Sequence, residues 1–176
     1  MTSSSGFHYG LSQAALSGPI LHPWDEGPAV AELQDLLCAH GFKLKIDGDY
    51  GGRTEAAAKL FQKKHGLRID GIIGPKTWMM LKTTVQPGTR ILKEGSSGAD
   101  VAELQGLLQV CGQMIRRDGI FGLETKQAVI AFQNRHRLDE TGKVDRVTWI
   151  VLRGNTSCLP TPPKQPSWFL NIRKWW

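Results

Sequence analysis

The sequence has few of the features that mark disulfide-rich, zinc-binding or membrane-spanning proteins. Its 176 residues include only three cysteines, Cys38, Cys111 and Cys158, which are widely spaced and form no C-x-x-C pair. This spacing is neither a disulfide framework nor a zinc knuckle, so we expect small buried side chains or a plain tail residue. No run approaches the roughly 18 apolar residues of a membrane span. The first residues lack the pattern of a secretory signal.

Patterns of catalytic and metal-binding residues are also scarce. His65 and His136 each precede the end of an expected helix, but neither has a second histidine at helical spacing. Carboxylates are plentiful, yet their spacing selects no pair about 5–10 Å apart, as glycoside hydrolysis requires. No cysteine or serine has a supporting histidine. We therefore expect no enzymatic activity, no metal and no cofactor.

The formal net charge of +6 is spread over the chain rather than concentrated in one domain. Residues 18–84 carry nine Lys/Arg against eight Asp/Glu, and residues 88–154 carry ten against eight. The last 22 residues add three basic side chains and no acidic one. Because nucleic-acid-binding domains usually present a basic face, we expect no nucleic-acid partner.

The chain contains an internal duplication. The stretch "DGDYGGRTEAAAKLFQKKH" begins at residue 47, and "DGIFGLETKQAVIAFQNRH" begins at residue 118. The two copies align without a gap at an offset of 71, and 24 of the 62 aligned pairs are identical. We expect one domain over residues 18–84 and a second over residues 88–154. An N-terminal arm over residues 1–17 and a C-terminal tail over residues 155–176 would flank them.

Hydrophobic spacing predicts three helices in each copy. In the first copy, apolar residues recur at helical spacing over 29–41 and 53–66, and a short helix over 74–81 has proline in its first turn. The second copy repeats the pattern, but Asp145 replaces the glycine ahead of the third helix and is the better N-cap. We expect an all-α fold of two tandem three-helix domains followed by an extended tail.

These patterns resemble the peptidoglycan-binding domain family, the three-helix bundles found beside cell-wall hydrolases in bacteria and phages. Three motifs carry the resemblance, in the same order in both copies: G-x-x-V-x-x-L-Q-x-x-L, D-G-x-[YF]-G-x-x-T-x-x-A-[LIV]-x-x-F-Q and G-x-x-[GD]-x-x-T-W-x-x-L. They cover about residues 18–154. The resemblance implies a protein that binds bacterial peptidoglycan without cleaving it. Two weak sites on one polymer would raise the apparent affinity.

The loop between the first and second helices of each copy has two interpretations. Its Asp-Gly-x-aromatic-Gly pattern fits a tight turn whose aromatic side chain fills the core, or one wall of a ligand groove. In the groove, we expect hydrogen bonds to sugar or peptide groups and an apolar platform. The residues expected to line it are Asp47, Tyr50, Arg53 and Thr54 in the first copy, and Asp118, Phe121, Glu124 and Thr125 in the second.

The C-terminal tail combines a stiff spacer with a cluster of large apolar residues. Four prolines between residues 160 and 166 favour an extended chain. Three interpretations compete for the apolar cluster beyond this spacer: it folds back on its own domain, lies at a membrane interface, or docks into a protein partner. We favour docking over both of the other interpretations. The residues expected to dock are Trp168, Phe169, Leu170, Ile172, Trp175 and Trp176.

A cell-wall ligand without a recognisable export signal indicates delivery by another route. We expect a protein made in the cytoplasm that anchors a phage tail, baseplate or contractile-injection assembly to the wall. The alternative is the wall-targeting subunit of an endolysin-type lytic system whose catalytic chain is separate.

Overall fold

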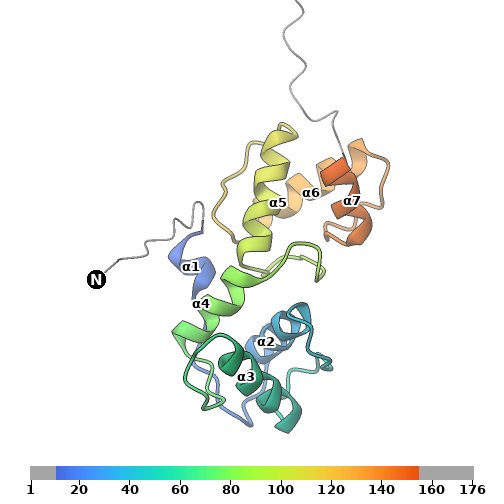
Figure 1. Ribbon diagram of the computed structural model, residues 1–176. Helices are drawn as coiled ribbons and strands as arrows, with labels where there is room; N and C mark the ends of the chain where they lie inside the picture. The colour runs from blue at the N-terminus through green and yellow to red at the C-terminus, as the bar shows by residue number, and fades with distance from the viewer. Residues whose placement is uncertain (1–10, 155–176) are drawn as a thin grey trace, which may run out of the picture.

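Residues 11–154 are described by the structure, a computed structural model. In this part of the chain all regular secondary structure is helical, apart from isolated β-bridges. The predicted all-α fold is confirmed. In chain order the helices are α1 (Gln13–Leu16), α2 (Pro28–Ala39), α3 (Gly52–Lys64), α4 (Pro75–Thr84), α5 (Ala99–Val110), α6 (Leu123–Arg135) and α7 (Arg146–Gly154) (Figure 1).

The duplication in the sequence is repeated in the structure. Helices α2, α3 and α4 form one bundle, and α5, α6 and α7 form the other (Figure 1). Two isolated antiparallel bridges recur in each bundle, with every partner 71 residues further on in the second copy. The bridged pairs are Leu21–Ile73 and Glu26–Asp49 in the first bundle, and Leu92–Val144 and Ser97–Ile120 in the second.

Each bundle buries its own hydrophobic core. Trp78 on α4 is fully buried, and its indole N–H donates to the carbonyl oxygen of Pro19 at 2.6 Å. Trp149 on α7 occupies the corresponding place and is 3% exposed. These two side chains give the short third helices the large apolar contact that holds them to their bundles.

A buried glutamine connects the first helix of each bundle to the loop after that helix. Gln34 on α2 is 1% exposed, and its Nε2 lies 2.9 Å from both Asp47 Oδ1 and the Asp49 carbonyl oxygen. Its Oε1 accepts hydrogen bonds from the backbone N–H groups of Asp47 and Gly48. Gln105 on α5 makes corresponding bonds in the second copy. The side-chain amide thus satisfies backbone groups that the tight turn leaves without partners.

A buried ion-pair cluster joins the two bundles. Arg90 lies between the copies, its side chain only 3% exposed, and its Nε donates to Asp100 Oδ2 at 2.7 Å. Its Nη1 donates to Asp35 Oδ2 at 3.2 Å. Asp35 lies on α2 and Asp100 on α5, so one guanidinium binds both bundles. Burial raises the pKa of Asp35, and the neighbouring guanidinium opposes this effect.

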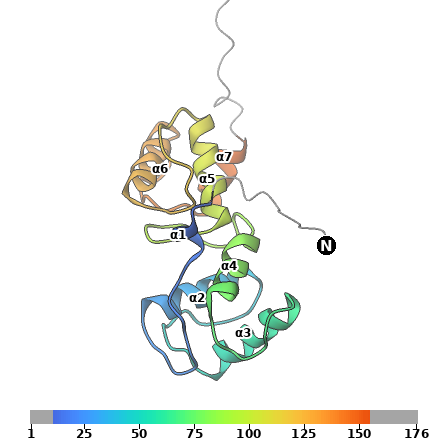
Figure 2. The ribbon, with the colours of Figure 1, turned by 90° about the vertical axis from the view of Figure 1, so that its left-hand side faces the viewer.

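A second polar contact lies where α4 meets α5. The buried Nζ of Lys82 lies 3.0 Å from Glu32 Oε1 and donates to the Ser17 carbonyl oxygen at 2.7 Å. Glu32 also accepts a hydrogen bond from Ser97 in the second copy. At Gly98 an added Cβ would lie 2.9 Å from the Lys82 carbonyl oxygen, so the close approach of α4 requires glycine there. Helix α4 accordingly lies between the rest of its bundle and α5 (Figures 1 and 2).

The segment expected to be an N-terminal arm belongs to the folded body from residue 11 onward. Helix α1 packs against α4 (Figure 2). The backbone N–H of Ser12 donates to the Asp118 carbonyl oxygen at 2.9 Å, which attaches this segment to the second copy as well. The predicted docking tail, with the residues expected to contact a partner, lies outside the described residues.

Two of the three cysteines lie in the described part. Cys38 is a half-buried free thiol whose Sγ is 3.5 Å from the Leu44 carbonyl oxygen. Cys111 is buried and disulfide-bonded. The expectation that the cysteines are plain buried side chains is therefore wrong for Cys111.

Candidate functional site

The Asp-Gly-x-aromatic-Gly loops are tight turns in both copies. Asp47 Oδ1 accepts hydrogen bonds from Gln34 Nε2 and from the Asp49 N–H. Asp118 Oδ1 accepts the corresponding bonds in the second copy. The hydrogen bond from Gln34 is the main reason that the pKa of Asp47 lies below its usual value. One oxygen of each aspartate therefore stabilises the turn, and only the other is free of these bonds.

The aromatic residues of the two loops do not form a platform for a ligand. Tyr50 is 1% exposed and Phe121 is fully buried, so that part of the groove prediction is wrong. The Tyr50 hydroxyl donates to the Gly71 carbonyl oxygen at 2.6 Å, and burial raises its pKa. Thr54 and Thr125 are also buried, each 3% exposed. The hydrophobic periodicity of the bundle explains this result, because the aromatic rings complete the cores.

Asp47, Arg53 and Glu124 are exposed members of the predicted groove, and Asp118 is half-buried. Arg53 and Glu124 occupy equivalent positions in the first turns of α3 and α6 and carry opposite charges. The two loops therefore do not present the same chemistry to a ligand.

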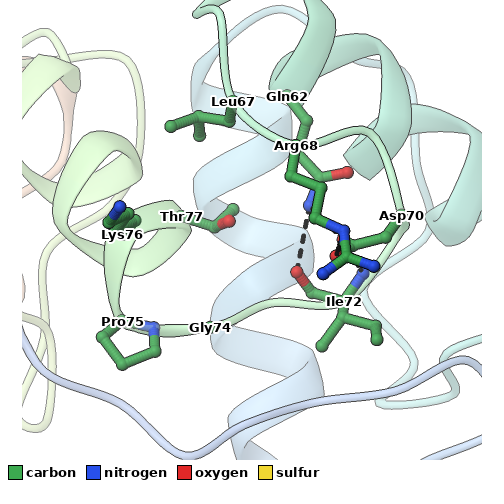
Figure 3. A pocket seen from close by; sticks show the side chains of 9 residues that line it. All are labelled: Gln62, Leu67, Arg68, Asp70, Ile72, Gly74, Pro75, Lys76 and Thr77. Atoms are coloured by element: carbon green, nitrogen blue, oxygen red, sulfur yellow. Dashed lines mark hydrogen bonds and ion pairs between the residues drawn. The ribbon is translucent and has the colours of Figure 1, made fainter.

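A pocket that the sequence analysis did not predict lies between the C-terminal end of α3 and the start of α4 (Figure 3). Its volume is about 380 Å³. It combines apolar walls with a few polar side chains, as small-ligand sites usually do. The lining residues are Gln62, Leu67, Arg68, Asp70, Ile72, Gly74, Pro75, Lys76 and Thr77.

The inner wall of this pocket is held by a second buried glutamine. Gln62 Nε2 donates to the Ile72 carbonyl oxygen at 3.0 Å and to Asp70 Oδ1 at 3.1 Å (Figure 3). The same Asp70 oxygen accepts the Ile72 N–H, which holds the pKa of Asp70 below its usual value. Arg68 Nε lies 3.3 Å from the other Asp70 oxygen. Asp70 is thus already engaged by protein donors, and Arg68 extends into solvent.

The second copy has a pocket at the equivalent place, with a volume of about 250 Å³. Gln133 takes the position of Gln62 and donates to the Lys143 carbonyl oxygen at 2.8 Å. The lining residues are Gln133, Arg137, Leu138, Asp139, Thr141, Asp145, Val147 and Thr148. Its recurrence in both bundles makes this pocket the strongest candidate site in the described part of the chain.

The two pockets differ at the start of the third helix. Asp145 Oδ1 accepts hydrogen bonds from both the backbone N–H and the hydroxyl of Thr148 at 2.8 Å, which confirms the predicted N-cap. At the same position α4 has Gly74, which provides no side-chain cap. The first pocket therefore retains free helix-end donors that the second pocket satisfies internally.

The cap on α7 should contribute measurably to stability. We expect Asp145→Ala to lower the free energy of unfolding by about 1 kcal/mol at pH 7. The hydrogen bond from the Thr148 amide is the main reason that the pKa of Asp145 is lowered. The contribution of the Asp145 carboxylate to the free energy of unfolding is therefore complete above its unfolded-state pKa of about 3.9, and it is lost as the pH falls through the folded-state pKa. Urea unfolding at pH 7 and at lower pH measures both effects.

Asp139→Ala is the matched control, because Asp139 lies on the same pocket and its carboxylate makes no hydrogen bond within the described residues. We expect its unfolding free energy to stay within about 0.5 kcal/mol of the wild type. An Asp145→Ala protein as stable as the Asp139→Ala protein at pH 7 would show that the cap is not formed.

Comparison with known families identifies both bundles. The family model described as "Putative peptidoglycan binding domain" matches residues 26–81 and 97–152. The chain belongs to the peptidoglycan-binding domain family. The resemblance carried by the three sequence motifs is confirmed, and each match spans one bundle from ahead of its first helix to its third helix.

Relatives of this peptidoglycan-binding chain include cell-wall enzymes. It is 38% identical over 92 residues to a spore cortex-lytic enzyme of Bacillus cereus, which covers 48% of this chain and 36% of that protein. It is 31% identical over 142 residues to an N-acetylmuramoyl-L-alanine amidase of Mycobacterium tuberculosis, covering 71% and 35%. The chain thus spans about a third of the length of these relatives.

Among solved structures, the SleB N-terminal domain is 41% identical to this chain, with a TM-score of 0.36. The match covers 37% of this chain and 90% of that domain. Within residues 11–154 no helix is long and apolar enough to cross a membrane. The same residues contain no group of three or more His, Cys, Asp or Glu side chains that could hold a metal ion.

Proposed function

We propose that this chain is a non-catalytic anchor that binds bacterial peptidoglycan through its two bundles. The observation that carries the proposal is the family match to both copies. Arg90 joins the bundles through ion pairs with Asp35 and Asp100, and Ser97 donates to Glu32 across the same junction, so two sites would sit at a fixed spacing. Two linked sites on one polymer increase the apparent affinity through effective concentration.

We further propose that the anchor serves a separate catalytic chain as the wall-targeting subunit of a lytic system. The names of the relatives, a cortex-lytic enzyme and an amidase, support this role. In each of them the part similar to this chain is about a third of the protein.

Wall anchoring in a phage tail, baseplate or injection assembly is the second candidate. It is supported by the six large apolar residues between 168 and 176, a pattern that favours docking to a protein partner. Mass spectrometry of purified particles distinguishes the two candidates, because only an assembly component would be present in them.

In the first pocket, the polar groups available to a wall ligand are those at the start of α4 and the cationic side chains of Arg68 and Lys76. Arg53, Glu124 and the outer oxygens of Asp47 and Asp118 are a second set of candidate contacts on the loops. We propose the first pocket as the principal site, because it is concave and combines apolar walls with polar groups at the start of α4.

Sedimentation with purified sacculi tests this function. We expect the full chain to pellet with the sacculi and to release no soluble muropeptides. Protein that remains entirely in the supernatant would contradict wall binding. Soluble muropeptides, released by the chain alone, would show that it is an enzyme.

A further inference from the structure

We propose that the first pocket binds the free carboxylate of a peptidoglycan stem peptide, and that Asp145 closes the second pocket to the same group. The two copies would then differ in function, with one carboxylate site per chain. This inference rests on the proposed wall-binding function and specifies the part of the polymer that is recognised.

The first pocket contains hydrogen-bond donors without acceptors. The backbone N–H groups of Lys76 and Thr77, in the first turn of α4, make no hydrogen bond within residues 11–154. The Thr77 side chain lines the pocket, is 5% exposed, and its hydroxyl also has no partner in that part of the chain (Figure 3). The N-terminus of a helix favours a negative charge through its free N–H groups and its dipole. These donors converge where an anion could bind.

The second copy shows which chemical group fits these donors. Thr148 is the counterpart of Thr77, 71 residues later, and its N–H and hydroxyl both donate to one oxygen of Asp145. A carboxylate is therefore already bound at this position in the second bundle. In the first bundle Gly74 leaves the position empty of side-chain atoms, and a ligand carboxylate could make the same two bonds to Thr77.

The charges around the two pockets favour an external anion in the first only. Arg68 and Lys76 line the first pocket, and the corresponding positions in the second copy are Asp139 and Val147. Counting charged lining residues, the first pocket has two cations and one carboxylate, and the second has one cation and two carboxylates. An incoming anion would be attracted to the first pocket and repelled by the second.

A singly charged peptide carboxylate suits the first pocket better than a phosphate group. The Asp70 carboxylate lies on the same pocket, so a doubly charged phosphate would meet stronger repulsion. Leu67, Ile72 and Pro75 supply apolar surface next to the donors. Such surface can contact the methyl group of a C-terminal alanine while its carboxylate bonds to Thr77.

Gly74→Asp transfers the closing carboxylate from the second copy to the first. Gly74 has an ordinary φ of −94°. A Cβ there would meet no atom within 4 Å, so the substitution should be tolerated. Calorimetric titration of the full chain with a disaccharide pentapeptide should give one site for the wild type. We expect Gly74→Asp to bind this ligand at least tenfold more weakly than the wild type does. We also expect the wild type to bind at least tenfold more weakly to a ligand whose terminal carboxylate is replaced by a carboxamide.

The threonines provide a matched pair of variants that do not add charge. We expect Thr77→Val to weaken binding at least threefold and Thr148→Val to leave the affinity within about twofold of the wild type. Circular dichroism melting checks that each variant is folded. Competition with inorganic phosphate distinguishes the two anion sources, and we expect it to displace the muropeptide poorly.

The proposal is overturned if folded Gly74→Asp binds the muropeptide like the wild type, or if the carboxamide ligand binds as well as the free acid. Displacement by phosphate at concentrations similar to the muropeptide would assign the site to phosphate groups instead. Wild-type protein that pellets with sacculi but does not bind the muropeptide would overturn this inference and leave the proposed function standing. Loss of both kinds of binding would overturn the proposed function.

Discussion

Replacing Gln34 with leucine should lower the free energy of unfolding by about 3 kcal/mol. The substitution keeps the side-chain volume nearly constant but removes every hydrogen bond between α2 and the loop at Asp47. The Gly48 N–H would be left buried without an acceptor, and each such group costs about 1–3 kcal/mol. Urea unfolding of the full chain, followed by circular dichroism, measures the loss.

Two further variants make this test specific. Gln105→Leu removes the corresponding bonds from the second copy and should have an effect of similar size. Gln127→Leu changes an exposed glutamine on α6 and should stay within about 0.5 kcal/mol of the wild type. If Gln34→Leu were as stable as Gln127→Leu, the buried amide would not be holding the loop.

Arg90→Met should be the most destabilising substitution at the junction of the bundles, with a loss of about 3–5 kcal/mol. It leaves the fully buried Asp100 carboxylate without its partner and removes the bond to Asp35 on the other bundle. The second replacement Asp100→Leu should recover much of the loss, because a buried pair replaced on both sides by apolar groups is often close to neutral. Urea unfolding of the single and double variants measures both effects.

Lys126→Met is the control for a salt bridge that is exposed. Lys126 and Glu94 are 40% and 52% exposed, so this substitution should cost less than about 1 kcal/mol. An Arg90→Met protein with a loss as small as that of Lys126→Met would show that the junction does not depend on the buried cluster.

The helices and the duplication could be predicted because they depend on local patterns. Apolar residues at helical spacing and the offset of 71 identified both bundles, and the residue type ahead of α7 indicated the cap at Asp145. The loops show the limit of such patterns. The Asp-Gly-x-aromatic-Gly sequence fits both a turn and a groove wall, and only the packing of Tyr50 and Phe121 shows that the rings are buried.

The candidate pocket and the junction could not be predicted, because they depend on side chains brought together by the tertiary fold. Gln62 looks in the sequence like an ordinary polar residue on a helix, and its burial becomes visible only with the α3–α4 loop folded around it. Arg90 likewise looks in the sequence like an ordinary surface charge near the start of the second domain, although it is buried between two aspartates. The sequence did contain one signal of the buried glutamines: each copy has a glutamine directly after a core leucine and another directly after a core phenylalanine. Buried polar side chains repeated in this way are typical of structural hydrogen-bond networks.

The central claim is that this chain binds peptidoglycan, and that the pocket at the start of α4 takes part. Backbone amide NMR spectra of the full chain, titrated with a soluble disaccharide pentapeptide, test it most directly. We expect the largest shift changes at the amides of Lys76 and Thr77, with much smaller changes at Val147 and Thr148 in the second copy. A titration to millimolar muropeptide that changes no amide chemical shift, or none around the first pocket, would contradict the account.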